Sequence, residues 1–333
     1  MLLEHTLTFK LNITNKGGNN MAQTFKFKDG KFTESSSDEA SVLFFHSLSS
    51  EDKQEYVARF NLPSDVFALD EIPSVAPRFE EIPHQDSDDS LVVVFSNVSN
   101  GNNDIPVEDR LETLTFILQD NTLLLFLKEG STFDQNLLHQ YKDKFDSIAS
   151  ILVYAGILMY SNLHDELQQQ KAAIDDLNNK AKNSTSGDVL RKVADTERNL
   201  VILEHTIETL DETVSVLLAT ETFTNKLDNS ALEYDLKWYN RQVIKLVHVY
   251  RDLLDSVSSL FSDLVSDNLN KLMKFLNSLS LVLASASLIS EFWGINAGGL
   301  PGENSDYGTL GVLILVVIST ASMAIFLKKK DYF

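Results

Sequence analysis

The sequence predicts an α+β domain with α/β/α layers, followed by long helices that lead into a C-terminal two-helix transmembrane hairpin. Three observations predict this fold class. Short apolar runs of strand length occupy the N-terminal part, and from about Phe133 onward the apolar residues take helical spacing. Two apolar segments, Phe275–Trp293 and Thr309–Leu327, then lie close to the C-terminus. We therefore expect a large domain outside the membrane and a hairpin within it.

The composition is strongly acidic, with 48 Asp and Glu against 28 Lys and Arg. All but four of these acids and all but five of these bases precede Lys271. Such a surface repels nucleic acid and anionic lipid and attracts cations, although solubility alone is an alternative explanation. The absence of cysteine excludes disulfides, zinc-thiolate sites and cysteine nucleophiles.

The N-terminal part is predicted to contain a flexible lead and a mixed α/β domain. The lead has no apolar signal segment, and Met21 is an alternative start. Leu91–Phe95 is a continuous apolar run typical of a strand, and Thr113–Leu118 and Thr122–Leu127 predict a hairpin. Glu51–Phe60 is a predicted helix with Ser49 or Ser50 as its N-cap.

The following region predicts long packed helices. No Pro or Gly occurs between Leu190 and Trp293, so one helix can run from about Ala231 into the first apolar segment. A turn is expected within Thr220–Ser230, and Asn240 is a polar gap in the second of two apolar stripes. These stripes are Leu200, Leu203, Ile207, Leu210, Val214 and Leu217, and then Leu236, Val243, Val247, Tyr250, Leu254, Val257, Phe261 and Leu264.

The two C-terminal segments are long enough to cross a hydrocarbon core of about 30 Å. Lys271 and Lys274 precede the first span and Lys328–Lys330 follow the second, whereas the loop between them has no basic residue. Because basic residues favour the cytoplasmic side, both termini are expected in the cytoplasm and the protein in the cell membrane. The predicted segments are a lead (1–22), an α/β domain (23–135), a helical bundle (136–270), a first span (271–293), an outer loop (294–308), a second span (309–327) and a basic tail (328–333).

Small and polar residues share one face of the first span. Ser280, Ala284, Ser287 and Glu291 are spaced four, three and four positions apart, and Asn277, Met273 and Asn270 extend that face toward the cytoplasm. Such a stripe indicates either tight helix packing or a water-lined path. One helix cannot enclose a pore, so a path requires several subunits around an axis.

The loop after the first span carries a recognisable motif. Trp293-Gly294-Ile295-Asn296, followed by Ala297-Gly298-Gly299-Leu300-Pro301, resembles the signature loop of the CorA family of divalent-cation transporters. Ile295 stands where the family has Met, and the Gly-Gly pair resembles the ZntB-like branch, which is associated with zinc, more than the magnesium branch. The tail Lys328–Phe333 resembles the short basic and aromatic tail of the family.

This resemblance implies a funnel-shaped homopentamer in the lipid bilayer that transports divalent cations: Mg²⁺, Co²⁺, Ni²⁺ or Zn²⁺. It implies that Gly294, Ile295 and Asn296 form the outer ion entrance. The implied pore-lining residues are Asn270, Met273, Leu276, Asn277, Ser280, Ala284, Ser287 and Glu291, of which Met273 and Leu276 would form a hydrophobic constriction that gates by dewetting. Family members are often regulated by metal bound between subunits, for which the candidates are Asp175, Asp176, Asp252, Asp255, Asp263 and Asp267. Solvated helix faces are the alternative explanation for these acids.

Several alternatives stay open on the sequence alone. Glu291 is a departure from the family pattern, and we hypothesise that it sets selectivity or carries protons, the alternative being an interfacial Glu that reaches bulk water. A dry zinc site is not expected, since there is no Cys and no His in the membrane segments. Proton-coupled, ZntB-like zinc transport remains an alternative, as does a non-transporting membrane-anchored cation sensor or structural protein. No nucleotide loop, zincin motif or dinucleotide fingerprint is present, so neither an enzyme nor an organic cofactor is expected.

Overall fold

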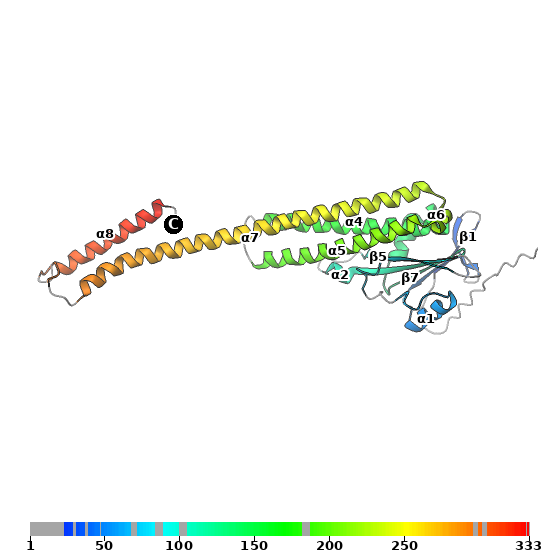
Figure 1. The fold of residues 1–333 in the computed structure, drawn as a ribbon, viewed down its shortest axis with the longest axis horizontal. Coiled ribbons are helices and arrows are strands. Elements are labelled where there is room, and N and C mark those ends of the chain that lie inside the picture. The colour runs from blue at the N-terminus through cyan, green and yellow to red at the C-terminus, as the bar shows by residue number, and fades with distance from the viewer. Residues whose placement is uncertain are drawn as a thin grey trace, which may run out of the picture. The chain divides into compact units, whose positions relative to one another are not determined.

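The computed structural model describes residues 23–28, 31–36, 39–46, 48–67, 72–83, 89–99, 105–181, 187–295, 299–301, 305–330 and 332. The chain divides into two compact units. The first comprises Met1–Lys180 and Arg191–Ser256, and the second comprises Ala181–Leu190 and Val257–Phe333. The first unit holds the sheet and its covering helices, and the second holds the C-terminal hairpin (Figure 1).

The described strands form one seven-stranded sheet in the order β2-β1-β3-β7-β6-β5-β4. Only the β3–β7 pair is parallel among these strands, and the other neighbours are antiparallel. The strands are β1 (Gln23–Lys28), β2 (Lys31–Glu34), β3 (Val42–His46), β4 (Arg78–Ile82), β5 (Ser90–Val98), β6 (Leu111–Gln119) and β7 (Thr122–Leu127).

The hairpin predicted from the sequence is confirmed as β6 and β7. These strands pair from Thr115 opposite Phe126 to Gln119 opposite Thr122, so the turn consists of Asp120 and Asn121. Asp120 has a φ of 49°, a left-handed conformation that Asp tolerates better than most residues. The predicted strand at Leu91–Phe95 is confirmed as part of β5, which is buried along its whole length.

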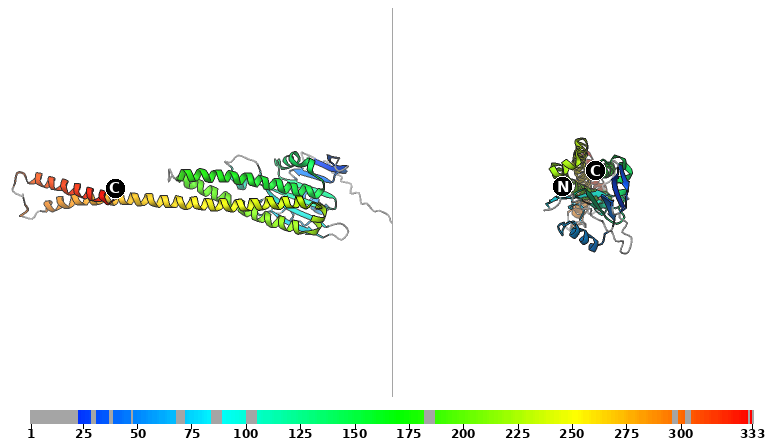
Figure 2. Two further views of the ribbon diagram at one scale, coloured as in Figure 1. Left: turned by 90° about the horizontal axis from the view of Figure 1, so that it is seen from above. Right: turned by 90° about the vertical axis from the view of Figure 1, so that its right-hand side faces the viewer.

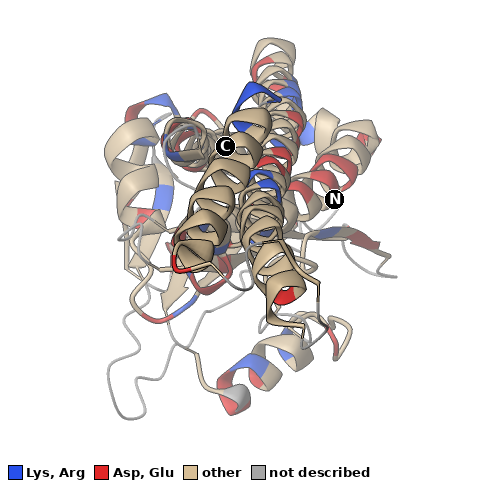
Figure 3. Cartoon of the chain, turned by 90° about the vertical axis from the view of Figure 1, so that its left-hand side faces the viewer, with Lys and Arg blue, Asp and Glu red and all other residues tan. Residues whose placement is uncertain are grey.

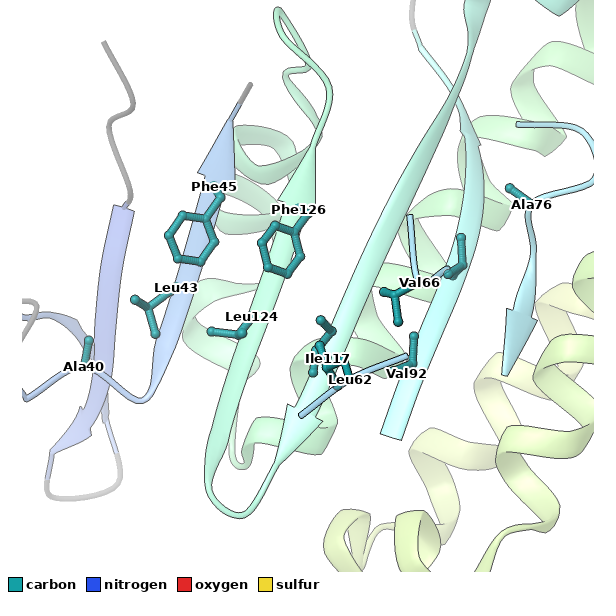
Figure 4. Close-up of a cluster of buried hydrophobic side chains, with 11 residues drawn as sticks. Ala40, Leu43, Phe45, Leu62, Val66, Ala76, Val92, Ile117, Leu124 and Phe126 are labelled. Carbon is teal, nitrogen blue, oxygen red and sulfur yellow. The ribbon is translucent and has the colours of Figure 1, made fainter. Parts of the chain in front are cut away.

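Helices cover both faces of the sheet and give the predicted α/β/α layers. Helix α1 (Ser50–Arg59) lies on one face, and the long helices lie on the other (Figures 1 and 2). Beneath α1, alternate residues of neighbouring strands form an apolar cluster, in which the Phe45 and Phe126 rings stack with centroids 5.2 Å apart (Figure 4). Of the two predicted N-cap candidates, Ser49 is the N-cap: its Oγ accepts from the Asp52 amide at 3.1 Å, which completes a capping box.

The second helical layer is built from α4 (Ile148–Ala181), α5 (Gly187–Ala219) and the first part of α7 (Ser230–Gly294). Short helices α2 (Val107–Arg110) and α3 (Phe133–Tyr141), with a 3-10 turn at Lys142–Lys144, precede them. The predicted stripes are buried, except that Leu264 is only half-buried. The unbroken long helix is confirmed as α7, which has 65 residues. The prediction of a turn within Thr220–Ser230 was incomplete. A short helix, α6 (Glu221–Leu227), also forms there, and its C-cap Asp228 has a left-handed φ of 43°.

Asn240, the predicted polar gap, faces α5 in the interior. It is 5% exposed, and its Nδ2 donates to Asp211 Oδ1. Tyr160 of α4 is fully buried, and burial together with the nearby Asp211 carboxylate raises the pKa of its phenol well above the usual value. The phenol therefore stays neutral at any physiological pH, and the Asn240–Asp211 hydrogen bond joins α7 to α5 beside it.

Helix α4 packs closely against α7 at Gly156, which also lies over Phe95 of the sheet. A Cβ placed there would come within 2.9 Å of Leu236 Cδ1 and 3.6 Å of Phe95 Cε2. We expect Gly156→Leu to lower the free energy of unfolding by about 1–3 kcal/mol through overpacking. Thermal unfolding followed by circular dichroism measures it, with Gly187→Leu as the control because a Cβ at Gly187 meets nothing within 4 Å. Equal shifts for both variants would contradict close packing at Gly156.

Candidate functional site

The C-terminal hairpin consists of the last part of α7 and of α8 (Gly308–Lys329), which runs back beside it (Figures 1 and 2). Both helices are long and apolar enough to cross a membrane, yet only 6% of the most apolar 18-residue stretch of each is buried. The core helix of a water-soluble domain would be mostly buried, so these helices require an apolar environment outside the single chain. Within the apolar segments Phe275–Trp293 and Thr309–Leu327, Glu291 is the single charged residue, and the hairpin is mostly tan in Figure 3.

One face of α7 packs within the hairpin. Ser278 is buried on this face, and Val282, Ser285, Ile289 and Trp293 are half-buried. They follow one another at intervals of four, three, four and four residues, which is one face of a helix. This set is the α8-facing side of the first span.

The predicted polar stripe lies on the opposite face. With about 100° of rotation per residue, its centre is roughly half a turn from the α8-facing side. Every member of the stripe is exposed in the single chain. The stripe residues are Asn270, Met273, Asn277, Ser280, Ala284, Ser287 and Glu291, and Leu276, the further residue implied to line the pore, is exposed beside them. The arrangement leaves the polar face of α7 available to other subunits or to water, while α8 covers the other side.

The serine hydroxyls of this segment are mostly satisfied within α7. Ser280 Oγ donates to the Leu276 carbonyl at 2.9 Å, and Ser290 Oγ donates to the Ala286 carbonyl at 3.1 Å. A hydroxyl that donates its hydrogen to its own helix keeps its oxygen lone pairs as acceptors. Ser280 can therefore present an acceptor oxygen from the stripe to a cation or to its bound water.

The predicted ion entrance begins at the end of α7. Gly294 is the last residue of the helix, and Ile295 follows it and is 53% exposed. Gly294 is still helical, and among the described residues of the loop Gly299 has a left-handed φ of 100°. Asn296, the third predicted entrance residue, lies outside the described residues.

A hydrogen bond joins the returning loop to the tip of α7. Trp293 Nε1 donates to the Pro301 carbonyl at 3.3 Å. Beside it lies a hollow of about 310 Å³ lined by Trp293, Pro301, Ser305, Tyr307, Gly308, Gly311, Val312 and Leu315. The aromatic residue of the motif thus holds the loop close to the Gly294–Ile295 end of the helix.

The six candidate regulatory aspartates are exposed on long helices and do not gather in one chain. Asp175 accepts from Lys171 at 2.6 Å, which raises the pKa of Lys171, and Asp176 pairs with Lys180. Asp267 pairs with Lys271 at 2.6 Å. Asp252, Asp255 and Asp263 are the remaining three. Within the described part of the chain no three His, Asp or Glu side chains are placed to hold a metal ion, so binding between subunits stays a prediction.

Three structural features of this chain were not predicted from its sequence. They are the buried Ser278, the contact between Trp293 and Pro301, and an ion pair between Arg110 and Glu166. Ser278 lies two residues before Ser280 and therefore off the stripe. This spacing was the only indication in the sequence that Ser278 has a different environment. The other two join residues without any periodic relation, so no pattern in the sequence indicates them.

The fold and the hairpin together define a membrane protein with a large α/β domain and two C-terminal spans. A family model described as CorA-like Mg²⁺ transporter protein matches residues 40–329. The chain therefore belongs to the CorA-like Mg²⁺ transporter family.

Individual relatives show the same likeness. The chain is 22% identical over 231 residues to the cobalt/magnesium transport protein CorA of Thermotoga maritima, a match that covers 66% of this chain and 64% of that protein. It resembles the complete structure of the CorA magnesium transporter from Methanocaldococcus jannaschii, with a TM-score of 0.72 at 16% identity over 94% of this chain and 98% of the other. The ZntB cytoplasmic domain of Vibrio parahaemolyticus matches with a TM-score of 0.56 at 11% identity, over 74% of this chain and 97% of that domain. These structural likenesses support the fold, including its α/β domain, long helices and C-terminal pair.

Proposed function

We propose that this protein transports divalent cations across the cell membrane through a pore that α7 lines in a homopentamer. The observation that carries the proposal is the position of the polar stripe, exposed on the face of α7 opposite to α8. Copies of α7 around an axis would turn that face inward and leave α8 outside, against lipid. Family membership and the cobalt/magnesium transport role named for the Thermotoga relative support the same function.

The chemistry of the stripe suits a hydrated hard cation. Mg²⁺ prefers oxygen ligands and releases its water reluctantly, so a ring of hydroxyl, amide and backbone oxygens can hold it through its hydration shell. Asn277, Ser280 and Ser287 supply such oxygens along the stripe, and Asn296 would supply them at the entrance. No organic cofactor and no catalytic role are part of this proposal.

We further propose that both termini lie in the cytoplasm. Lys271 and Lys274 flank the first span, Lys328 and Lys329 end α8, and the loop between the spans contains no basic residue. This orientation places the acidic N-terminal part, which attracts cations, on the cytoplasmic side of the pore.

A regulatory metal site between subunits is also part of the proposal. Asp252, Asp255 and Asp263 are its better candidates, since Asp175, Asp176 and Asp267 already pair with lysines of their own helix. If these acids bind metal, Mg²⁺ or Zn²⁺ would lower the flux, and replacing them with Asn would weaken that inhibition.

Transport into liposomes tests the function directly. Uptake of Mg²⁺, Zn²⁺, Co²⁺ and Ni²⁺ into vesicles that contain the purified full chain is measured with and without a pH gradient. Flux that saturates with cation concentration is expected, and Asn296→Ala should abolish most of it. Zinc flux that follows the proton gradient would instead indicate a ZntB-like mechanism. Absence of flux for every ion would leave the membrane-anchored sensor or structural protein as the better explanation.

The same assay tests the role of Glu291. This exposed carboxylate ends the stripe one turn before Ile295, so a ring of them would concentrate cations at the outer mouth. We expect Glu291→Gln to lower flux at limiting cation concentration by about tenfold and to change ion preference or pH dependence. The matched control is Asp306→Asn, an exposed carboxylate of the outer loop. Unchanged flux, preference and pH dependence would mean that Glu291 is only an interfacial residue in contact with bulk water.

A further inference from the structure

Ser278 differs from every other described residue in the membrane part of α7. After Phe261, it is the only described residue of that helix that is buried, with 0% exposure. Its Oγ donates to the main-chain carbonyl of Tyr332 at 3.2 Å. This hydrogen bond therefore joins the first span to the C-terminal tail. The proposed transport function does not require it.

The direction of this hydrogen bond is unusual for a serine inside a helix. Ser280, Ser285 and Ser290 each donate to a carbonyl three or four residues earlier in α7. Serine in transmembrane helices commonly bonds back to its own helix in this way. Ser278 instead donates to a residue 54 positions later in the chain. In a site without water an unsatisfied hydroxyl is costly, so this contact holds the tail in place.

The tail is turned back so that it can accept this bond. The amides of Lys330 and Tyr332 both donate to the Leu327 carbonyl, at 3.1 and 3.2 Å, and the bond from Tyr332 spans five residues, as the longer bond of a Schellman-type helix end does. Leu327 is 4% exposed and is the only buried residue among those described in α8. The two buried residues of the hairpin helices therefore lie at the same place, where the tail meets α7.

The contact lies beside the predicted constriction. Leu276 and Met273 lie within two turns of Ser278 along α7, on the opposite side of the helix, and both are exposed. A lateral force on Ser278 thus acts directly on the position of these two side chains. Pulling Ser278 toward the tail and α8 draws Leu276 and Met273 away from any axis that the stripe faces.

We infer that the C-terminal tail is a brace that positions the pore helix: the Tyr332 carbonyl holds Ser278 and thereby keeps the Met273–Leu276 constriction wide enough to conduct. Ser278 is a positioning residue and touches no ion. This inference rests on the proposed transport function. It predicts that loss of the brace lowers maximal flux while the half-saturating cation concentration, set at the other end of the span, stays the same.

The absence of cysteine from this chain permits a direct test of the contact. In the full chain, Ser278→Cys combined with Tyr332→Cys should form a disulfide within one subunit when copper phenanthroline is added. Mass tagging of free thiols and gel mobility measure it. The control pair is Ser290→Cys with Tyr332→Cys, because position 290 lies about 18 Å farther along the helix. Equal cross-linking of both pairs, none in the first pair, or cross-linked dimers would each overturn the proposed contact.

Flux through the same reconstituted protein tests the consequence. Without oxidation, the Ser278→Cys and Tyr332→Cys double variant should have a maximal flux about fivefold below wild type, the effect of losing one buried hydrogen bond of about 1 kcal/mol. Oxidation should restore the flux and a reductant should lower it again, which a variant that merely folds poorly cannot do. Flux that is equal in both redox states overturns the brace.

Single changes separate the main chain of Tyr332 from its side chain. Because the carbonyl is the acceptor, Tyr332→Phe should conduct as wild type does, whereas Ser278→Ala and removal of residues 331–333 should each lower maximal flux about fivefold. Ser290→Ala is the control for loss of a serine hydroxyl. If the wild type conducts and Ser278→Ala conducts equally well or better, the brace is overturned but the transport function is not. A wild-type protein without any flux overturns the transport function instead, while the cross-link still reports on the contact.

Discussion

Replacing Ala284 with leucine is expected to lower maximal cation flux at least about tenfold, since a barrier increase of about 1.4 kcal/mol suffices for that change. Ala284 is exposed in the middle of the polar stripe, between Ser280 and Ser287. In a pentamer, five leucine side chains would narrow the path and remove water from it, and a dry segment is a strong barrier to a hydrated ion. Uptake of Mg²⁺ into liposomes, normalised to the amount of reconstituted protein, measures the effect.

The control for this experiment is the same change of residue type in the other span. Ala321 of α8 is also exposed, and α8 would face lipid in the proposed pentamer. Ala321→Leu should therefore leave flux within about twofold of wild type, since one leucine more on a lipid-facing surface changes neither the path nor the packing. A larger loss at Ala321 than at Ala284 would contradict the assignment of α7 as the pore helix.

Arg110→Met is expected to lower the free energy of unfolding of the N-terminal domain by about 3–5 kcal/mol. The Arg110 Nη2 to Glu166 Oε1 distance is 2.7 Å, and the two side chains are only 5% and 2% exposed. Gln170 Nε2 donates to the same carboxylate oxygen at 2.8 Å. Without the guanidinium, the Glu166 charge stays buried with a single neutral donor, which destabilises the junction of α2 and α4.

An exposed ion pair between α2 and α5 supplies the matched comparison. Arg198 pairs with Glu108, but the side chains are 67% and 53% exposed, so solvent screens the interaction. We expect Arg198→Met to change the stability by less than about 1 kcal/mol. Thermal unfolding of the full chain in detergent, followed by circular dichroism, compares the two. Equal shifts would show that burial of the Arg110–Glu166 pair adds nothing. Arg110→Met combined with Glu166→Met should recover most of the loss, because no unpaired charge remains.

The local features of this protein were predictable because each depends on residues close together in the chain. The 65-residue α7 follows from a long stretch without Pro or Gly that carries apolar residues at helical spacing, and the β6–β7 hairpin from two apolar runs around Asp120. The stripe from Asn270 to Glu291 depends only on the spacing of its residues along a helix, and these residues are exposed on one face of α7 as that spacing predicts. The Gly-Ile-Asn motif likewise indicated the family from a few adjacent residues.

The two apolar C-terminal helices, the unbroken length of α7 and the face of α7 that carries the polar residues could thus be predicted from the sequence alone. The order of the sheet, in which β1 and β2 join at the edge beside β3, and the pairing of β3 with the distant β7 could be learned only from the folded structure. The folded structure also shows that Ser278 meets Tyr332 and that Arg110 meets Glu166. These contacts join residues between 54 and about 80 positions apart. Such pairs form because the whole fold brings them together, and no local propensity or period records them.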